Sequence, residues 1–139
     1  MKETTERAKL LQQALDIADS LCKVAKVDDN GLYWETLSLG PNLTPTYMRD
    51  DSYYSGTTGI VAFLSQLYSQ TREQKYLSVA IDAAKSTLKH AQSTPQGIEG
   101  FYVGKTGVFC SLAELSLVTG DQFFVDECLS QIKTQMLDR

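Results

Sequence analysis

The sequence predicts an all-α fold, an incomplete α/α toroid of about two and a half helical hairpins, as one partial domain over residues 1–139. Three observations predict it: helical spacing of apolar residues near the N-terminus, an internal repeat in the second half of the chain, and alternation of nearly all-apolar helices with amphipathic ones. A closed ring of six such hairpins needs on the order of 300 residues. We therefore expect this chain to form only part of a ring.

Residues 5–27 predict the first helix, which we expect in the outer layer. Apolar residues recur at spacings of three and four, namely Leu10, Ala14, Ile17, Leu21 and Val24. The turn-forming residues 28–31 then end the helix. For residues 28–53 we expect an irregular segment with a short extended stretch, because one glycine and two prolines after residue 39 indicate a loop.

An internal repeat covers most of the chain after residue 53. Residues 54–88 align with residues 102–136 without a gap when Tyr54 is placed on Tyr102. The same alignment places Gly56 on Gly104 and Gly59 on Gly107, which gives a shared turn motif. We expect hairpins over about 54–92 and 102–138, each with an apolar inner helix and then an amphipathic outer helix.

Composition excludes several classes of partner and site. The formal net charge of −4 argues against nucleic acid, because phosphate binding requires a basic surface. No run approaches the roughly 18 apolar residues of a membrane span, and residues 1–9 lack the apolar core of a signal peptide, so we expect a cytoplasmic protein. Cys22, Cys110 and Cys128 occupy apolar helical positions, which indicates packing in the core.

The motif Tyr-x-Gly-x-x-Gly precedes both predicted inner helices. We expect its glycines to allow positive φ angles and close backbone packing where each helix starts. The helix N-termini then lie at one end of the ring, where free N–H groups can receive anionic or polar ligand groups. Tyr53, Tyr54, Phe101 and Tyr102 flank these turns. Two interpretations of the aromatic residues remain open: they line a peptide groove, or they pack around the glycine turns.

The pattern resembles the lanthionine synthetase C-like (LanC-like) family, most closely the N-terminal part of the cyclase domain of class II lanthipeptide synthetases (LanM). The resemblance is carried by Asp29-Asn30-Gly31-Leu32-Tyr33-Trp34, Tyr54-Ser55-Gly56-Thr57-Thr58-Gly59-Ile60 and Gly100-Phe101-Tyr102-Val103-Gly104-Lys105-Thr106-Gly107-Val108. It implies a part in thioether ring formation, in which a Cys of a lanthipeptide precursor adds to a dehydrated Ser or Thr. Zinc is the cofactor of the complete family domain.

The sequence departs from that family in two ways. Ser55 and Val103 stand where the family often has Asp before the first glycine. The family's zinc ligands lie in Cys-Gly and Cys-His-Gly motifs, and no Cys here is followed by Gly or His. We therefore assign no catalytic and no metal-binding residue, and expect the chain to be inactive without the remainder of the toroid or a complementary subunit. A precursor peptide is the other partner that the resemblance implies.

Two polar sites receive structural interpretations. His90 lies near the end of an outer helix, where a cation suits the helix dipole. The pair Asp50-Asp51 is interpreted as a solvated turn before the first inner helix. Two other functions remain open: a fragment of a sugar-active α/α toroid, which would need paired carboxylates in its mouth, and a non-catalytic helical-repeat module that binds partners through exposed apolar faces.

Overall fold

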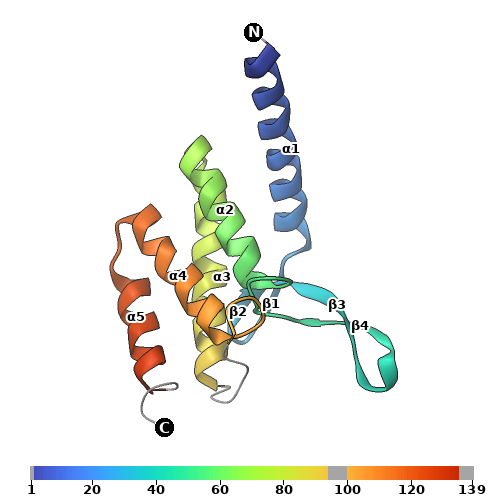
Figure 1. Ribbon diagram of the computed structural model, residues 1–139, viewed down its shortest axis with the longest axis vertical. Coiled ribbons are helices and arrows are strands. Elements are labelled where there is room, and N and C mark those ends of the chain that lie inside the picture. Colours follow the sequence, from blue (N-terminus) through green and yellow to red (C-terminus); the bar gives the residue numbers. More distant parts are fainter. Residues whose placement is uncertain (1, 94–99, 135–139) are drawn as a thin grey trace.

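The computed structural model describes residues 2–93 and 100–134, which form five α-helices, one short 3₁₀ turn and two antiparallel two-stranded sheets (Figure 1). The helices are α1 (Lys2–Val24), α2 (Thr57–Thr71), α3 (Gln74–Ser93), α4 (Lys105–Thr119) and α5 (Phe123–Ile132). The strands are β1 (Lys26–Asp28), β2 (Gly31–Tyr33), β3 (Glu35–Leu39) and β4 (Pro45–Arg49), with the 3₁₀ turn η1 (Pro41–Leu43) between β3 and β4. No helix in these two ranges is both long and apolar enough to cross a lipid bilayer.

The helices after residue 56 pair as two hairpins in the part of the chain that the structure describes. Helix α2 packs against α3, α4 packs against α5, and α2 and α4 lie next to each other (Figure 1). We call the first turn with α2 and α3 unit one, and the second turn with α4 and α5 unit two. The closed-ring arrangement to which these units would belong stays a prediction.

The repeat is visible in the core as well as in the sequence. Val61 and Leu64 of α2 are buried, and so are Phe109 and Leu112, which occupy the equivalent positions of α4. Burial of equivalent apolar positions explains why the two hairpins fold alike, because each inner helix must remove most of its surface from water. Helices α3 and α5 repeat the same pattern with Tyr76 and Phe124, both of which are buried.

Residues 28–53 form two small sheets where we expected an irregular segment, within a mostly helical structure that is compatible with the all-α class. Strand β1 pairs with β2, and β3 pairs with β4. The turn after β1 forms because the Asp28 carboxylate accepts hydrogen bonds from the N–H groups of Asn30 and Gly31. Gly31 has a φ of +125°, a conformation that side chains rarely allow. Residues 28–31 therefore form the turn of the β1–β2 hairpin, which follows α1 in the chain.

Trp34 joins the first hairpin to the helices. Its side chain is buried, and the indole N–H donates to the carbonyl oxygen of Leu21 in α1 at 2.8 Å. Its backbone N–H donates to the hydroxyl of Thr57, the first residue of α2, at 3.2 Å. A single aromatic residue thus fixes α1 and the start of α2 relative to each other.

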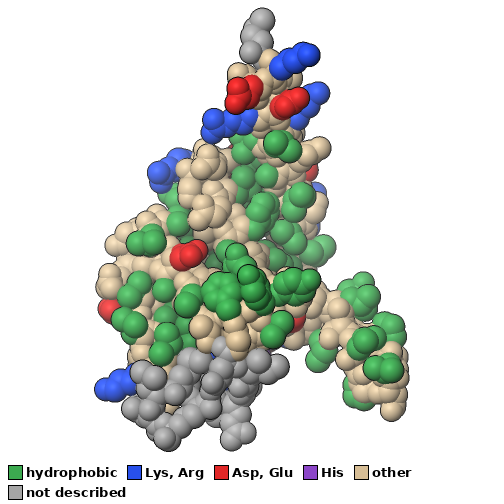
Figure 2. All heavy atoms as spheres, in the orientation of Figure 1, with side chains coloured by type: hydrophobic (Ala, Val, Ile, Leu, Met, Phe, Trp, Pro, Cys, Tyr) green, Lys and Arg blue, Asp and Glu red, His purple; other side chains and the backbone are tan. Residues whose placement is uncertain are grey.

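The second hairpin, β3–β4, projects from the helical body (Figure 1). Apolar side chains cover much of it in the space-filling view (Figure 2). Leu37 lies opposite Tyr47, Leu39 lies opposite Pro45, and the large side chains among these four are exposed. The hairpin is therefore held at its base, where β4 ends at Arg49, rather than along its length.

Helix α1 is attached to α3 by polar contacts. The Asp19 carboxylate accepts a hydrogen bond from the hydroxyl of Tyr76 at 2.8 Å and forms an ion pair with Lys75 at 3.1 Å. Both partners belong to the first turn of α3. Only Ala18 is fully buried among the described residues of α1. Much of this helix therefore remains in contact with solvent.

Candidate functional site

The two glycine turns lie side by side at one end of the helical hairpins. The backbone N–H of Tyr54 donates to the carbonyl oxygen of Tyr102 at 2.9 Å. The rings of Tyr53 and Phe101 are in contact, with centroids 5.4 Å apart. The prediction that the inner-helix N-termini share one end is therefore correct for these two units.

The first glycine of each turn does not use the conformation that we expected. Gly56 and Gly104 have φ angles of −127° and −123°, which are ordinary extended values. The prediction of positive φ is therefore wrong at these positions. Positive φ occurs instead at Gly31 in the β1–β2 turn and at Gly120, which ends α4.

Close packing explains the second glycine of each turn. A Cβ atom on Gly59 would lie 2.2 Å from the carbonyl oxygen of Tyr53, and one on Gly107 would lie 1.6 Å from that of Phe101. Both distances are far below van der Waals contact. The backbone before each helix therefore lies directly on the first turn of that helix, and only glycine fits at positions 59 and 107.

The N-terminus of α2 is partly satisfied by the chain itself. The backbone N–H of Thr57 donates to the carbonyl oxygen of Asp50 at 2.7 Å. The hydroxyl of Thr58 donates to the carbonyl oxygen of Asp51 at 2.5 Å. The segment before the helix thus folds back and occupies groups that we expected to receive a ligand.

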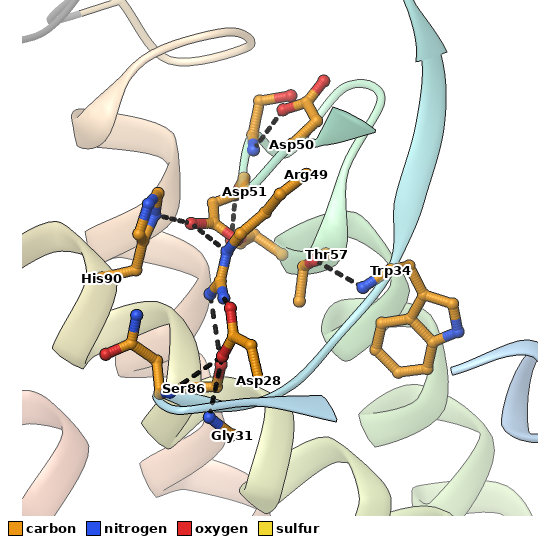
Figure 3. A network of polar contacts seen from close by, with 12 residues as sticks. Asp28, Gly31, Trp34, Arg49, Asp50, Asp51, Thr57, Ser86 and His90 are labelled. Carbon is orange, nitrogen blue, oxygen red and sulfur yellow. Dashed lines mark hydrogen bonds and ion pairs between the residues drawn. The ribbon is translucent and has the colours of Figure 1, made fainter. Parts of the chain in front are cut away.

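A polar network lies beside this turn and joins four parts of the chain (Figure 3). Arg49 donates through Nε to the Asp51 carboxylate at 3.0 Å and through a terminal nitrogen to the Asp28 carboxylate at 3.0 Å. Its other terminal nitrogen contacts the Ser86 hydroxyl at 3.1 Å. His90 Nδ1 contacts the Asp51 carboxylate. The side chains of Arg49 and Asp51 are only 13% and 15% exposed, so the pair is largely shielded from water.

The interpretation of Asp50-Asp51 as a solvated turn is wrong for Asp51. Its carboxylate is held between Arg49 and His90. His90 does lie at the end of α3, but the structure places it against a carboxylate rather than only at a helix terminus. Residues 51 and 90 are far apart in the sequence, so no local pattern could reveal this contact.

Asp50 is held in its ionised form by hydrogen bonds. Burial alone would raise the pKa of its carboxyl, but hydrogen bonds from the Ser55 hydroxyl and the Ser52 backbone N–H hold that pKa below its usual value. A general acid needs a carboxyl that keeps its proton near neutral pH. Asp50 is therefore better suited to fixing the turn than to general acid catalysis.

A cavity of about 320 Å³ opens next to the network. It lies between the loop before α2, the end of α3 and the start of α4. Its polar lining includes Asp50, Asp51, Ser52, Thr87, His90 and Lys105. The cavity has room for a small polar group, although Asp50, Asp51, Ser52 and His90 already bond to other parts of its wall.

The aromatic residues at the turns divide into two kinds. Tyr53 and Phe101 pack against each other, as one of the two interpretations required. Tyr54 and Tyr102 are 76% and 63% exposed, although the Tyr102 ring also packs edge-on against Phe101, with centroids 5.3 Å apart. A peptide-facing role for Tyr54 and Tyr102 therefore stays a prediction.

The cysteines do not all pack in the core. Cys128 is buried, and burial raises the pKa of its thiol to about 12. Cys22 is half-buried, and burial likewise raises the pKa of its thiol. Cys110 is exposed, so the prediction is wrong there. Its equivalent in unit one, Ala62, is only half-buried, which means that this position of the inner helix is not a core position.

The residues that the structure describes do not fit a zinc ion. They contain no group of three His, Cys, Asp or Glu side chains that could hold a metal. The cysteines lie on α1, α4 and α5, and the protonated thiol favoured at Cys128 is a poor metal ligand. His90 Nδ1 is already in contact with Asp51.

A comparison with protein families finds a match over the part of the chain that contains both glycine turns. Residues 47–139, about two thirds of the chain, match the family described as lanthionine synthetase C-like protein. The match begins within β4 and includes both glycine turns and both helical hairpins. A comparison with curated proteins finds no match. On the family match, the chain belongs to the lanthionine synthetase C-like family.

Proposed function

We propose that this chain forms the N-terminal part of a cyclase of the LanM type that makes thioether rings in a lanthipeptide precursor. The observation that carries the proposal is the match of residues 47–139 to the lanthionine synthetase C-like family. The repeated turn supports it, because Gly59 and Gly107 are placed alike and Tyr54 is bonded to Tyr102. We further propose that the zinc ligands are supplied from outside residues 2–93 and 100–134.

The chemistry of the proposed reaction is an addition of a thiol to a carbon–carbon double bond. The sulfur of a precursor Cys loses its proton and bonds to the β-carbon of a dehydroalanine or dehydrobutyrine. The electron pair of the double bond moves toward the α-carbon and its carbonyl, and a proton then adds at the α-carbon. This chain's part is to build and orient the wall, with Tyr54 and Tyr102 as candidate contacts for the peptide.

Reconstitution tests the proposal. The probes are a dehydrated class II precursor peptide and a zinc-loaded LanM cyclase domain from which the first two hairpins have been deleted. We expect neither this chain nor the deleted domain alone to form thioethers, and the mixture to form them. Mass spectrometry after thiol alkylation measures this, because each Cys consumed in a ring escapes alkylation.

Two results would contradict the proposal. One is failure of the mixture to cyclise the peptide although the two polypeptides form a complex. The other is metal analysis that finds one zinc per chain in the purified protein, since the ligands would then lie within it. A matched control uses Gly59→Ala in this chain, because a Cβ there would meet the carbonyl oxygen of Tyr53 and disturb the wall.

The sugar-active alternative gains no support from the turn. A glycoside hydrolase needs one carboxylic acid that stays protonated and a second carboxylate opposite it. Asp51 is paired with Arg49 and His90, and the pKa of Asp50 lies below its usual value. The adjacent carboxylates therefore favour anchoring of the turn over acid–base work.

A further inference from the structure

The β3–β4 hairpin and η1, residues 35–49, form an arm with two chemically different faces. Successive residues of a strand point to opposite faces, and residues paired directly across two strands share a face. The pairing gives one face that is entirely apolar, which consists of Leu37, Leu39, Pro45 and Tyr47. The other face carries mostly hydroxyl groups and consists of Thr36, Ser38, Thr46 and Met48. The arm is thus a small amphipathic sheet.

The apolar face of the arm is open to solvent, whereas the hydroxyl-bearing face turns toward the helices. Ser38 and Met48 of the second face line the cavity between the arm, α3 and α4. On the apolar face, Leu37, Leu39 and Tyr47 are 61%, 65% and 67% exposed. Figures 1 and 2 show the arm extending away from the helices. Because two strands alone are marginally stable in water, an uncovered apolar face of this kind calls for a second surface.

The arm has no charge pattern that would select a charged partner. Residues 36–48 contain no Asp, Glu, Lys, Arg or His. At the base, Arg49 is largely buried and pairs with Asp28 and Asp51. Two copies can therefore bring their arms together without contact between like charges, although each chain has a net charge of −4. A lipid surface fits less well, because the arm offers no unpaired cation for the headgroups.

We propose that the apolar face of the arm is a dimer interface, on which the same face of a second copy of this chain packs around a two-fold axis. This contact places the Leu and Tyr side chains of both copies between two sheets about 10 Å apart. The exposed parts of these side chains and of Leu43 in η1 amount to on the order of 500 Å². Two copies then bury about 1,000 Å², near the lower limit of a specific interface, so the dimer is reversible.

The arm is separate from the two hairpin units. It lies before residue 54, outside the internal repeat, and it projects on the side of the molecule away from α5 (Figure 1). Two arms can therefore meet while the helices of the two copies stay apart. The inference does not depend on the proposed function, and loss of the dimer and loss of thioether formation are separate results.

Sedimentation equilibrium of the full chain over a dilution series tests the proposal. We expect a monomer–dimer equilibrium with a dissociation constant of about 50 µM. Leu39→Lys places one charge of the same sign on the apolar face of each copy and should raise that constant at least about tenfold. Ser38→Lys is the matched control, because it adds the same charge at an exposed position of β3 on the opposite face. It should change the dissociation constant less than about twofold.

NMR spectra over the same dilution series locate the interface without any substitution. We expect the amide signals of residues 37–47 to shift with concentration, and those of α4 to stay in place. A chain that remains monomeric at about 500 µM would overturn the proposal, since that is tenfold above the expected dissociation constant. A dimer whose shifts map to the helices instead of the arm would overturn it as well.

Two further results would count against the apolar face as a dimer contact. One is an equal loss of dimer with Leu39→Lys and Ser38→Lys, because the two faces would then not differ. The other is cosedimentation of a monomeric chain with phosphatidylcholine vesicles that is lost with Leu39→Lys. That result would assign the face to a lipid surface and show that our choice of partner is wrong.

Discussion

The carbonyl oxygen of Tyr53 points at Gly59 so closely that a Cβ atom on that glycine would lie 2.2 Å away. The same contact recurs in the second repeat between Phe101 and Gly107, at 1.6 Å. A contact that excludes every side chain and occurs twice at equivalent positions explains why the turn requires glycine there. The requirement comes from packing of backbone on backbone, and not from an unusual φ angle.

Substitution of Gly59 by Ala should destabilise the protein. The added methyl group must displace the turn from α2, and overpacking of this kind costs about 1–3 kcal/mol. Urea unfolding followed by circular dichroism measures the loss. Gly100→Ala is the matched control, because a Cβ there has nothing within 4 Å and the change should be within about 0.5 kcal/mol. Equal effects of the two substitutions would contradict the packing account.

Sequence patterns predicted the helices well because burial repeats with the period of the chain. Val61 and Phe109 occupy equivalent buried positions, and their helices were found from that repetition. Only a short extended stretch was expected where four strands form, because the strand pairing depends on one carboxylate, Asp28, that caps its own turn and also pairs with Arg49. The Asp51–His90 contact lies beyond local patterns, since it joins residues that only the folded hairpin brings together.

Asp51→Asn should weaken the joint between the β3–β4 hairpin and α3. The amide keeps the shape of the carboxylate but leaves the largely buried Arg49 without one of its charge partners. Leaving a buried hydrogen-bonding group without its partner lowers the free energy of unfolding by about 1–3 kcal/mol. Urea unfolding should therefore show a clear loss relative to Asp82→Asn, which alters an exposed carboxylate on α3. Two variants of equal stability would show that the network adds nothing to folding.

Ser55→Ala should change how stability depends on pH. The Ser55 hydroxyl helps to hold the pKa of Asp50 below its usual value, so the Asp50 contribution is present above about pH 4. It is lost as the pH falls through the lowered folded-state pKa. Removing the hydroxyl raises that pKa, so the variant should be less stable than the parent at pH 7, and the gap should shrink toward pH 2.

Free energies of unfolding from urea titrations between pH 2 and pH 7 test this pH dependence. The control is Ser78→Ala, on an exposed position of α3, for which the difference from the parent should not vary with pH. A gap for Ser55→Ala that stays constant across the range would mean that Asp50 does not gain from this hydroxyl.

Tyr76→Phe should loosen α1 from α3 without disturbing the core. The ring of Tyr76 stays buried, and only its hydrogen bond to Asp19 is removed. That bond is the main cause of the lowered pKa of the Asp19 carboxyl, with Lys75 as the second. We expect faster amide exchange in the C-terminal half of α1 and unchanged exchange in α4. Tyr68→Phe serves as the control, and faster exchange in α1 there would argue against a specific role of Tyr76.

The three cysteines should react with iodoacetamide in an order set by burial. Cys110 is exposed and should react first, and Cys22 should follow slowly. Cys128 should react at least about a hundredfold more slowly than after unfolding in urea, because its pKa of about 12 leaves little thiolate at pH 8. Peptide mass spectrometry after timed alkylation gives each rate. Slow alkylation of Cys110 in the folded chain that becomes fast on dilution would mean that α4 is covered by self-association.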